Sequence, residues 1–418
     1  MGSDVTITAT PPQVRPSAVH DGRRWLTVAA ATFAIAWGGN EFTPLLVMYR
    51  TQNGLSAVTV DILLFAYVLG IVPALLIGGA LSDRLGRRPV MLPAPGLGAL
   101  GSLILAAGAD SAVMLATGRV LSGLALGLAM AVGGSWIKEL SSPPWDIGDA
   151  GARRAAMSLT AGFGVGAGTA GVLAQWAPWP MALPYALNTA LCLAAGALLL
   201  AAPETRARQL TVRPLWADLA VPAAAHRRFL LVVAPVAPWV FGAAASAYAV
   251  LPALMSDRAG GAPIAFSALL CVVTLGSGLA IQSVGRRIDV PGGVRGVTVA
   301  LSLLVAGMLA AAMAAASLTV WLSLLAAAIL GCGYGMALIT GLHEVQRIAG
   351  PDDLAGLTAV FYGLSYLGFG VPAVLATLSL RWPGILTYPV MFGVGAAAAM
   401  VSLAIVAAGH RVSRHRPR

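Results

Sequence analysis

Twelve long apolar runs constrain this chain more than any other feature of its sequence. A helix that crosses a lipid bilayer needs about 20 consecutive apolar residues, and twelve stretches of that kind follow one another between short polar segments. Only 10% of the 418 residues are charged, against about 25% in ordinary soluble domains. We therefore expect an all-α polytopic membrane protein with twelve transmembrane helices. The predicted spans are 25–49, 58–81, 89–108, 112–137, 156–177, 180–201, 229–251, 262–284, 294–316, 320–342, 354–379 and 384–408.

The positions of the basic residues predict how these spans are oriented. If the N-terminus is cytoplasmic, all but four of the 26 lysines and arginines fall in cytoplasmic tails and loops. Arg50, Arg258 and Arg381 fall outside, and Arg119 lies within a span. Because basic residues accumulate on the cytoplasmic side of membrane proteins, both termini are expected to be cytoplasmic, in the plasma membrane. The net charge of +10 is then explained by basic residues that keep loops in the cytoplasm and face anionic lipid headgroups, and nucleic-acid binding is not expected.

The polar segments divide the chain into five parts. The longest internal polar stretch holds five arginines and three prolines and separates the spans six and six. The expected parts are a disordered cytoplasmic tail at 1–24, a six-helix bundle at 25–201, a cytoplasmic linker at 202–228, a second six-helix bundle at 229–408 and a basic cytoplasmic tail at 409–418.

An internal repeat supports the division into two bundles. The sequences GALSDRLGRRP (79–89) and GLAIQSVGRRI (278–288) follow the second and the eighth span, and they share four residues at a constant offset of 199. Two parallel copies of one six-helix unit are a known transporter plan, in which the substrate site lies between the halves near the middle of the bilayer. We therefore expect a substrate cavity between the two bundles.

The loop after the second span also carries a family motif. GALSDRLGRRPVM resembles the signature loop of the major facilitator superfamily, and it lies between spans 2 and 3, where that family has it. The resemblance implies two pseudo-symmetric six-helix bundles over 25–408. We expect one glycine, Gly79, to allow close helix approach, and another, Gly86, to permit a tight turn. The residues that fit the motif are Gly79, Leu81, Asp83, Arg84, Gly86, Arg87 and Arg88.

The same resemblance implies a gate at the cytoplasmic side. Asp83 can accept hydrogen bonds from the free amides at a helix N-terminus, which the resemblance places at the start of span 11, PDDLAGL. Arg87 or Arg88 could then meet Asp352 or Asp353. Such a latch would hold the halves together on the cytoplasmic side and break when the carrier opens inward. The alternative is that these charges only retain the loop in the cytoplasm.

Two charged residues lie inside predicted spans. The sequence RVLSG (119–123) resembles an arginine motif of proton-coupled carriers in this family, and NEFTP (40–44) resembles the acid-plus-proline segment of some multidrug/proton antiporters. At 1.5 Å per residue, Glu41 and Arg119 both lie roughly 10–12 Å below the outer end of their spans. A lone charge deep in a span costs about 2.5–3.5 kcal/mol, so such residues usually pair. The pair is a candidate proton site; the alternatives are a static ion pair or a glutamate that reaches the outer interface.

A third resemblance concerns helix packing in the fifth span. The sequence GFGVGAGTAG (162–171) is similar to the antiporter motif of the twelve-span drug/proton antiporter group. Gly162, Gly166 and Gly171 fit it, whereas Ala167 replaces the expected proline and Ala170 a glycine. Glycines at such positions allow helices to approach closely.

Aromatic residues are the candidates for the cavity between the halves. The spans contain few Asn, Gln or Asp residues, so an amphipathic or hydrophobic solute fits better than a sugar or an organic anion. The candidates are Trp37, Tyr67, Trp136, Trp239, Tyr248, Tyr334, Phe361, Tyr362 and Tyr366.

These features predict a proton-coupled exporter of hydrophobic or amphipathic small molecules that works by alternating access. The alternatives are a metabolite importer by symport, a facilitator, or a membrane receptor or enzyme that does not transport. No catalytic constellation is visible, so an enzyme is not expected. The expected partners are the small-molecule substrate and the lipid bilayer, with the proton as coupling ion, no metal or other cofactor, and a functional monomer.

Overall fold

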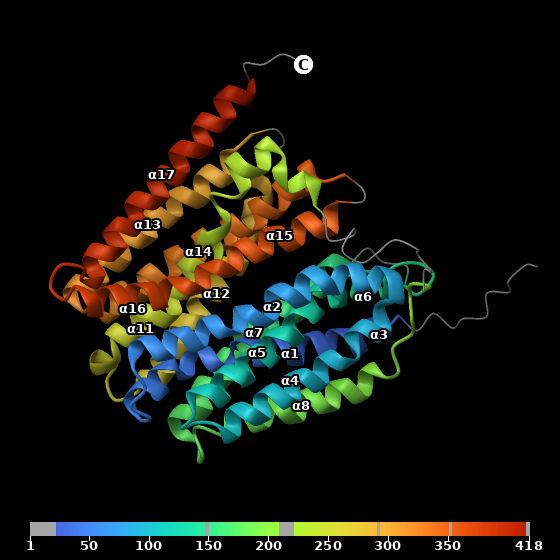
Figure 1. The fold of residues 1–418 in the computed structure, drawn as a ribbon, viewed down its shortest axis with the longest axis horizontal. Coiled ribbons are helices and arrows are strands. Elements are labelled where there is room, and N and C mark those ends of the chain that lie inside the picture. Colours follow the sequence, from blue (N-terminus) through green and yellow to red (C-terminus); the bar gives the residue numbers. More distant parts are fainter. Residues whose placement is uncertain (1–21, 147–149, 209–220, 291–292, 351–352, 415–418) are drawn as a thin grey trace, which may run out of the picture.

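The computed structural model describes residues 22–146, 150–208, 221–290, 293–350 and 353–414. Within these ranges the chain is helical and contains no strand (Figure 1). Most of the predicted tail at 1–24 and the residue Asp352 lie outside the described residues.

The N-terminal half contains six of the predicted spans. Two of its helices begin at a serine that caps free amides: Ser56 accepts a hydrogen bond from the Thr59 amide at 3.1 Å, and Ser111 accepts one from the Met114 amide at 3.4 Å. The elements of this half are α1 (Trp25–Thr51), α2 (Ala57–Leu85), α3 (Arg87–Met91), α4 (Pro93–Ala107), α5 (Ala112–Leu128), η1 (Ala129–Gly133), α6 (Gly134–Leu140), α7 (Gly151–Trp176) and α8 (Leu183–Leu199).

The C-terminal half repeats this arrangement after the linker. Its elements are η2 (Pro222–Ala225), η3 (Phe229–Val233), α10 (Ala237–Ala245), η4 (Ser246–Val250), α11 (Leu251–Leu254), η5 (Ser256–Arg258), α12 (Pro263–Ile288), α13 (Arg295–Ser317), α14 (Val320–Ile348), α15 (Leu354–Tyr366), η6 (Leu367–Gly370), α16 (Val371–Arg381) and α17 (Tyr388–Arg414).

Each predicted span coincides with one helix or with a run of consecutive helices. Among the described residues, ten of these segments are long and apolar enough to cross a membrane. The other two are α1, whose apolar run is interrupted by Asn40 and Glu41, and α8, which has only 17 residues. A polytopic helical membrane protein is therefore what the structure shows, while twelve crossings and cytoplasmic termini stay predictions.

The same glycine-mediated helix crossing occurs in both halves. In the N-terminal half, Gly70 of α2 packs on the backbone of α5, and Gly123 of α5 packs on that of α2. In the C-terminal half, Gly278 of α12 and Gly335 of α14 pack in the same manner. The repeat is thus structural as well as sequential. The prediction for Gly79 is wrong in this arrangement, because a Cβ there would have no neighbour within 4 Å; only its repeat partner makes the close approach.

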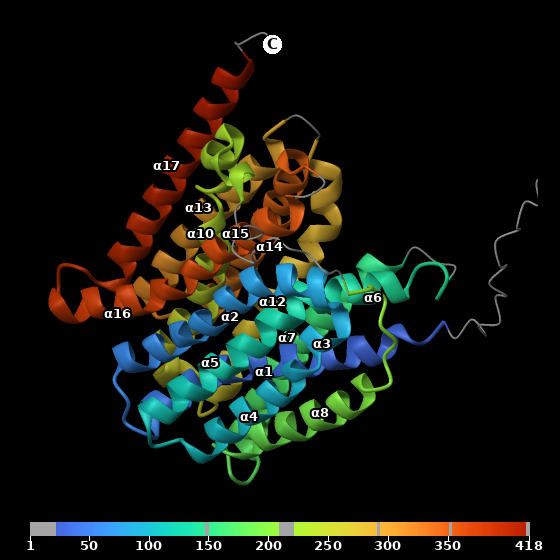
Figure 2. The same ribbon diagram turned by 45° about the vertical axis from the view of Figure 1, so that its right-hand side comes forward.

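The two halves are packed against each other near one end of the molecule, among other places. We call the end that carries residues 79–91 and α6 the loop face, and the other end the opposite face (Figure 2). Near the opposite face, Gly171 of α7 packs against Ala268 of α12, and Gln175 accepts a hydrogen bond from the amide of Ile264 at 3.0 Å. Gly370 lies against Phe65 of α2. The described contacts therefore close the opposite face.

Candidate functional site

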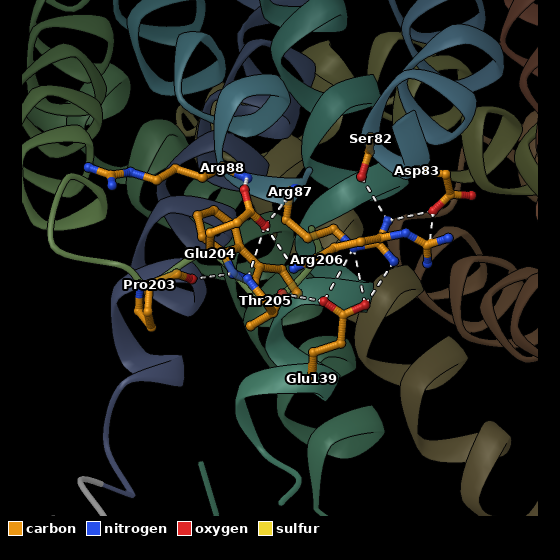
Figure 3. A network of polar contacts seen from close by, with 10 residues as sticks. Ser82, Asp83, Arg87, Arg88, Glu139, Pro203, Glu204, Thr205 and Arg206 are labelled. Atoms are coloured by element: carbon orange, nitrogen blue, oxygen red, sulfur yellow. Dashed lines mark hydrogen bonds and ion pairs between the residues drawn. The ribbon is translucent and has the colours of Figure 1, made fainter. Parts of the chain in front are cut away.

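Arg87 is the centre of a polar network at the loop face. Its Nη1 donates hydrogen bonds to Asp83 at 2.9 Å and to Ser82 at 2.7 Å, and its Nη2 donates to Glu139 of α6 at 2.8 Å (Figure 3). Arg87 is only 6% exposed. A buried guanidinium that donates to two carboxylates holds the end of α2, the start of α3 and the end of α6 in one arrangement.

The linker supplies the carboxylate that the sequence analysis missed. Glu204 accepts hydrogen bonds from the backbone amides of Arg87 and Arg88, both at 2.9 Å, and from those of Thr205 and Arg206, both at 3.0 Å. Burial alone would raise the pKa of Glu204, but these four amides outweigh it and lower the pKa below the ordinary value. The predicted turn at Gly86 has a φ of +100°, and a Cβ there would lie 2.6 Å from the Glu204 carboxylate. Glycine is needed at this position for both reasons.

Three further contacts bind the linker to the N-terminal half. Arg206 lies 3.3 Å from Asp83, Thr205 donates a hydrogen bond to Glu139, and the carbonyl of Pro203 accepts one from Trp136 Nε1 at 3.0 Å (Figure 3). Residues 203–206 are therefore a part of the loop-face network. The signal in the sequence was an acidic residue directly after the sixth span.

The predicted latch to span 11 is not formed in this arrangement. The described contacts of Asp83, Arg87 and Arg88 all lie within the N-terminal half or the linker. Asp353 is at the start of α15, and no described contact joins it to them. The latch was expected to break when the carrier opens on this face, so its formation in the other state stays a prediction.

The lowered pKa of Glu204 predicts a pH-dependent difference in stability. A depressed carboxyl pKa stabilises the folded chain above the unfolded value of 4.5, and this contribution is lost as the pH falls through the lowered pKa. We expect Glu204→Gln to lower the free energy of unfolding by about 0.5–1 kcal/mol at pH 7, since the carboxylate is exposed and partly screened. Thermal unfolding in detergent from pH 8 to pH 4 would measure the difference.

The matched control for this test is Asp257→Asn, which removes an exposed carboxylate at the other end of the molecule. Its stability should follow that of the parent chain. A Glu204→Gln difference that stays constant or grows as the pH falls below 4.5 would contradict the role of the carboxylate.

Glu41 is fully buried within the N-terminal half. Its Oε1 accepts a hydrogen bond from Ser102 of α4 at 3.0 Å, and Ser102 also donates to Asn188 of α8 at 2.8 Å. Its Oε2 has no hydrogen-bond partner. The carboxylate therefore lies behind α1, toward α4 and α8, and does not line the cavity described below.

Arg119 makes no ion pair with Glu41 in the described structure. Its guanidinium carbon lies 4.2 Å from the ring centre of Tyr67 and 4.7 Å from that of Phe42, and its Nη1 donates a long hydrogen bond of 3.4 Å to the Gly39 carbonyl. The two charges are near enough to interact electrostatically. The predicted direct pair is thus replaced by two separate sites on opposite sides of α1.

A cavity of about 250 Å³ lies between the halves and contains Arg119. It is lined by Ala156 and Thr160 of α7 and by Gln282 and Leu342 of the C-terminal half, all of which belong to the half of their span nearer the loop face. Thr43, Leu64 and Arg119 line it from the half of their span nearer the opposite face, so the cavity lies near the middle of the bundle, between the two halves. Its aromatic members are Tyr67, Phe163, Phe241, Tyr248, Tyr334, Tyr362, Tyr366 and Phe369.

Four of the aromatic residues predicted to line the cavity do not line it. Trp37 packs edge-on against Phe33, Trp136 is bound to the linker, Trp239 donates a hydrogen bond to Ser402 of α17, and Phe361 is buried beside Gly341. None of them lines the cavity, because each points from its helix into the packing of its own half or toward the linker. Tyr67, Tyr334 and Tyr362 do line it, as do Tyr248 and Tyr366.

Irregular helical turns contribute three lining residues, of which Met130 and Phe369 were not among the candidates from the sequence. Met130 lies in η1 and Phe369 in η6, and Tyr248 lies in η4. Such turns interrupt the regular hydrogen-bond ladder and often occur at functional sites. Asn40, Phe163, Phe241 and Gln282 also line the cavity; only Asn40, a polar residue inside an apolar run, gave a signal in the sequence.

The three glycines of the fifth span have different roles. A Cβ on Gly162 would lie 2.5 Å from the carbonyl of Phe33, and one on Gly166 would lie 2.7 Å from the backbone of Trp37, so both fit α7 against α1. Gly171 faces the other half, where a Cβ would overlap that of Ala268. Two of the glycines therefore pack one half, and the third closes the contact between the halves.

Comparison with known proteins agrees with this architecture. Residues 26–373 match the family model of the Major Facilitator Superfamily. The fold is similar to that of a mutant of the nucleoside transporter NupG (12% identity, TM-score 0.72, covering 92% of this chain and 99% of that one). It is also similar to a POT family transporter in complex with 5-aminolevulinic acid (13% identity, TM-score 0.72, covering 93% of this chain and 96% of that one). A third similar structure is the peptide transporter POT in complex with sulfate (15% identity, TM-score 0.72, covering 94% of this chain and 95% of that one). With the family model covering most of the chain, the conclusion is direct: this chain belongs to the Major Facilitator Superfamily.

Proposed function

We propose that the protein is a proton-coupled carrier that exports hydrophobic or amphipathic small molecules across the plasma membrane by alternating access. The observation that carries this proposal is the cavity of about 250 Å³ between two pseudo-symmetric halves that are packed together near the opposite face. A site between two halves that is reached from one side at a time is the arrangement that alternating access needs. In this proposal the N-terminus is cytoplasmic, and the arrangement with the opposite face closed is the inward-facing state.

The proposed coupling residue is Glu41, with Arg119 as its electrostatic neighbour. Glu41 is a fully buried carboxylate with one unpartnered oxygen, and an ionisable residue within a span is a functional candidate by default. In this proposal Arg87 and its partners form the cytoplasmic gate. The linker holds them in the inward-open state, and the latch to Asp353 forms when that side closes.

Import by symport is the second candidate, since the similar NupG and POT proteins are named as a nucleoside transporter and a peptide transporter. The test uses proteoliposomes that contain a pH-sensitive dye and a series of fluorescent amphipathic solutes. In export by antiport, solute movement in one direction is accompanied by proton movement in the other; in symport, both move together. Solute movement that is unaffected by an uncoupler would contradict both proton mechanisms.

A further inference from the structure

The cavity has one charged side chain among its described lining residues, and that side chain is Arg119. It is 1% exposed, its Nε has no hydrogen-bond partner, and its one described hydrogen bond is the long contact to the Gly39 carbonyl. None of the ion pairs in the described structure includes it, and the nearby Glu41 accepts a hydrogen bond from Ser102 instead. The guanidinium therefore keeps a positive charge and unused donors at the wall of the cavity.

An isolated cation at this depth is costly, and its surroundings compensate for only a part of the cost. A charge near the middle of a span is costly, and the two aromatic faces of Tyr67 and Phe42 offset this cost without satisfying the hydrogen-bond donors of the guanidinium. Tyr67, which contributes one of these faces, also has a buried hydroxyl without a hydrogen-bond partner. Two unsatisfied donors on neighbouring cavity residues are the arrangement expected of a site whose anion is supplied by the ligand.

The rest of the wall fits a flat apolar group. Phe241 stacks on Tyr366 with ring centres 4.4 Å apart and on Phe369 with ring centres 5.0 Å apart. All three line the cavity, and there is no carboxylate among the described lining residues. A phosphate ester would bring more negative charge than one arginine balances, and a neutral solute would leave the guanidinium unpaired. A planar carboxylate matches the two-donor edge of arginine and its single charge.

We propose that the preferred substrates are aromatic monocarboxylates, bound with the carboxylate on Arg119 and Tyr67 and with the ring against the stack formed by Phe241, Tyr366 and Phe369. This inference rests on the cavity being the transport site proposed above, and it narrows the substrate class. It reverses the sequence-based preference against organic anions. That preference rested on the scarcity of Asn, Gln and Asp residues in the spans, whereas the structure places the charge of Arg119 at the cavity and Glu41 behind α1.

The test compares three probes of one shape on the full chain in lipid nanodiscs. The probes are 2-naphthoate, its uncharged amide and the corresponding methylamine, and their affinities are measured by calorimetry. We expect the acid to bind at least tenfold more tightly than the amide, and the amine to bind more weakly than both. Equal affinities of the unmodified chain for the acid and the amide would overturn the proposal.

Variants of the chain then identify the side chain whose charge favours the acid over the amide. Arg119→Gln should lower the affinity for the acid to that for the amide and leave the amide unchanged, and Tyr67→Phe should weaken the acid several-fold. Arg258→Gln removes one exposed charge far from the cavity and should change neither. If thermal unfolding shows that Arg119→Gln does not fold, the three probes on the unmodified chain and the Tyr67→Phe variant still test the proposal. An acid preference that survives in folded Arg119→Gln would overturn the assignment.

Transport of the same probes separates this inference from the proposed function. If the acid binds through Arg119 but does not move across proteoliposome membranes, the transport function fails and the anion site stands. If the amide is transported as well as the acid, the carrier function stands and the substrate class proposed here is wrong.

Discussion

Gly171→Ala is expected to lower the transport rate roughly fivefold to a hundredfold while the protein remains folded. The added Cβ would overlap the Cβ of Ala268 across the contact between the two halves near the opposite face. Both atoms are attached directly to helix backbones, so neither can move aside by a change of rotamer. Overpacking of this kind costs about 1–3 kcal/mol, and every 1.4 kcal/mol changes an equilibrium about tenfold.

The added methyl group destabilises only one state of the transport cycle. The contact between Gly171 and Ala268 exists when the opposite face is closed, so the methyl group destabilises this state relative to one in which that face is open. The population should therefore shift toward the state in which the opposite face is open. Double electron–electron resonance between spin labels at Asp110 and Arg258, in opposite-face loops of the two halves, would report it as a longer distance.

Gly164→Ala is the matched control, because it lies on the same helix and a Cβ there would meet nothing within 4 Å. It should transport at the parent rate and show the parent distance. Parent-like transport and an unshifted distance in Gly171→Ala would show that this contact does not set the closure of the opposite face.

Glu41→Gln is expected to abolish proton-driven accumulation and to leave folding intact. One proton that moves down ~100 mV supplies ~2.3 kcal/mol, which sustains roughly a fortyfold gradient at ~1.4 kcal/mol per tenfold. Without a titratable group at this position the gradient should fall to about one. The fold should tolerate the change, because Ser102 can still donate to Oε1 and no direct ion pair is broken.

Accumulation of a transported solute in proteoliposomes with an imposed proton gradient would measure this effect. Glu41→Asp keeps a titratable carboxyl and should retain part of the coupling. If Glu41→Gln accumulates solute normally, Glu41 is structural. Asp61 is then the next residue to test, since it is a buried carboxylate of α2 that pairs with Arg50.

The fold could be predicted further from the sequence than the site could. Apolar runs and spaced glycines are local signals, and every predicted span coincides with helical structure. The direction of a side chain around its helix is not local, which is why Glu41 and Arg119 were matched in depth but lie on different sides of α1. Trp136 was misplaced for the same reason, since its partner is a linker carbonyl 67 residues away.

The position of Glu204 has a consequence for where the N-terminal half ends. Its carboxylate caps the amides at the start of α3, so the chain belongs structurally to this half at least as far as Arg206 and not only as far as the end of α8. A gene divided at residue 201 would yield a fragment whose α3 amides lack their acceptor. A division after Arg206 keeps the cap with the helix it serves, and separately produced halves should be designed with that boundary.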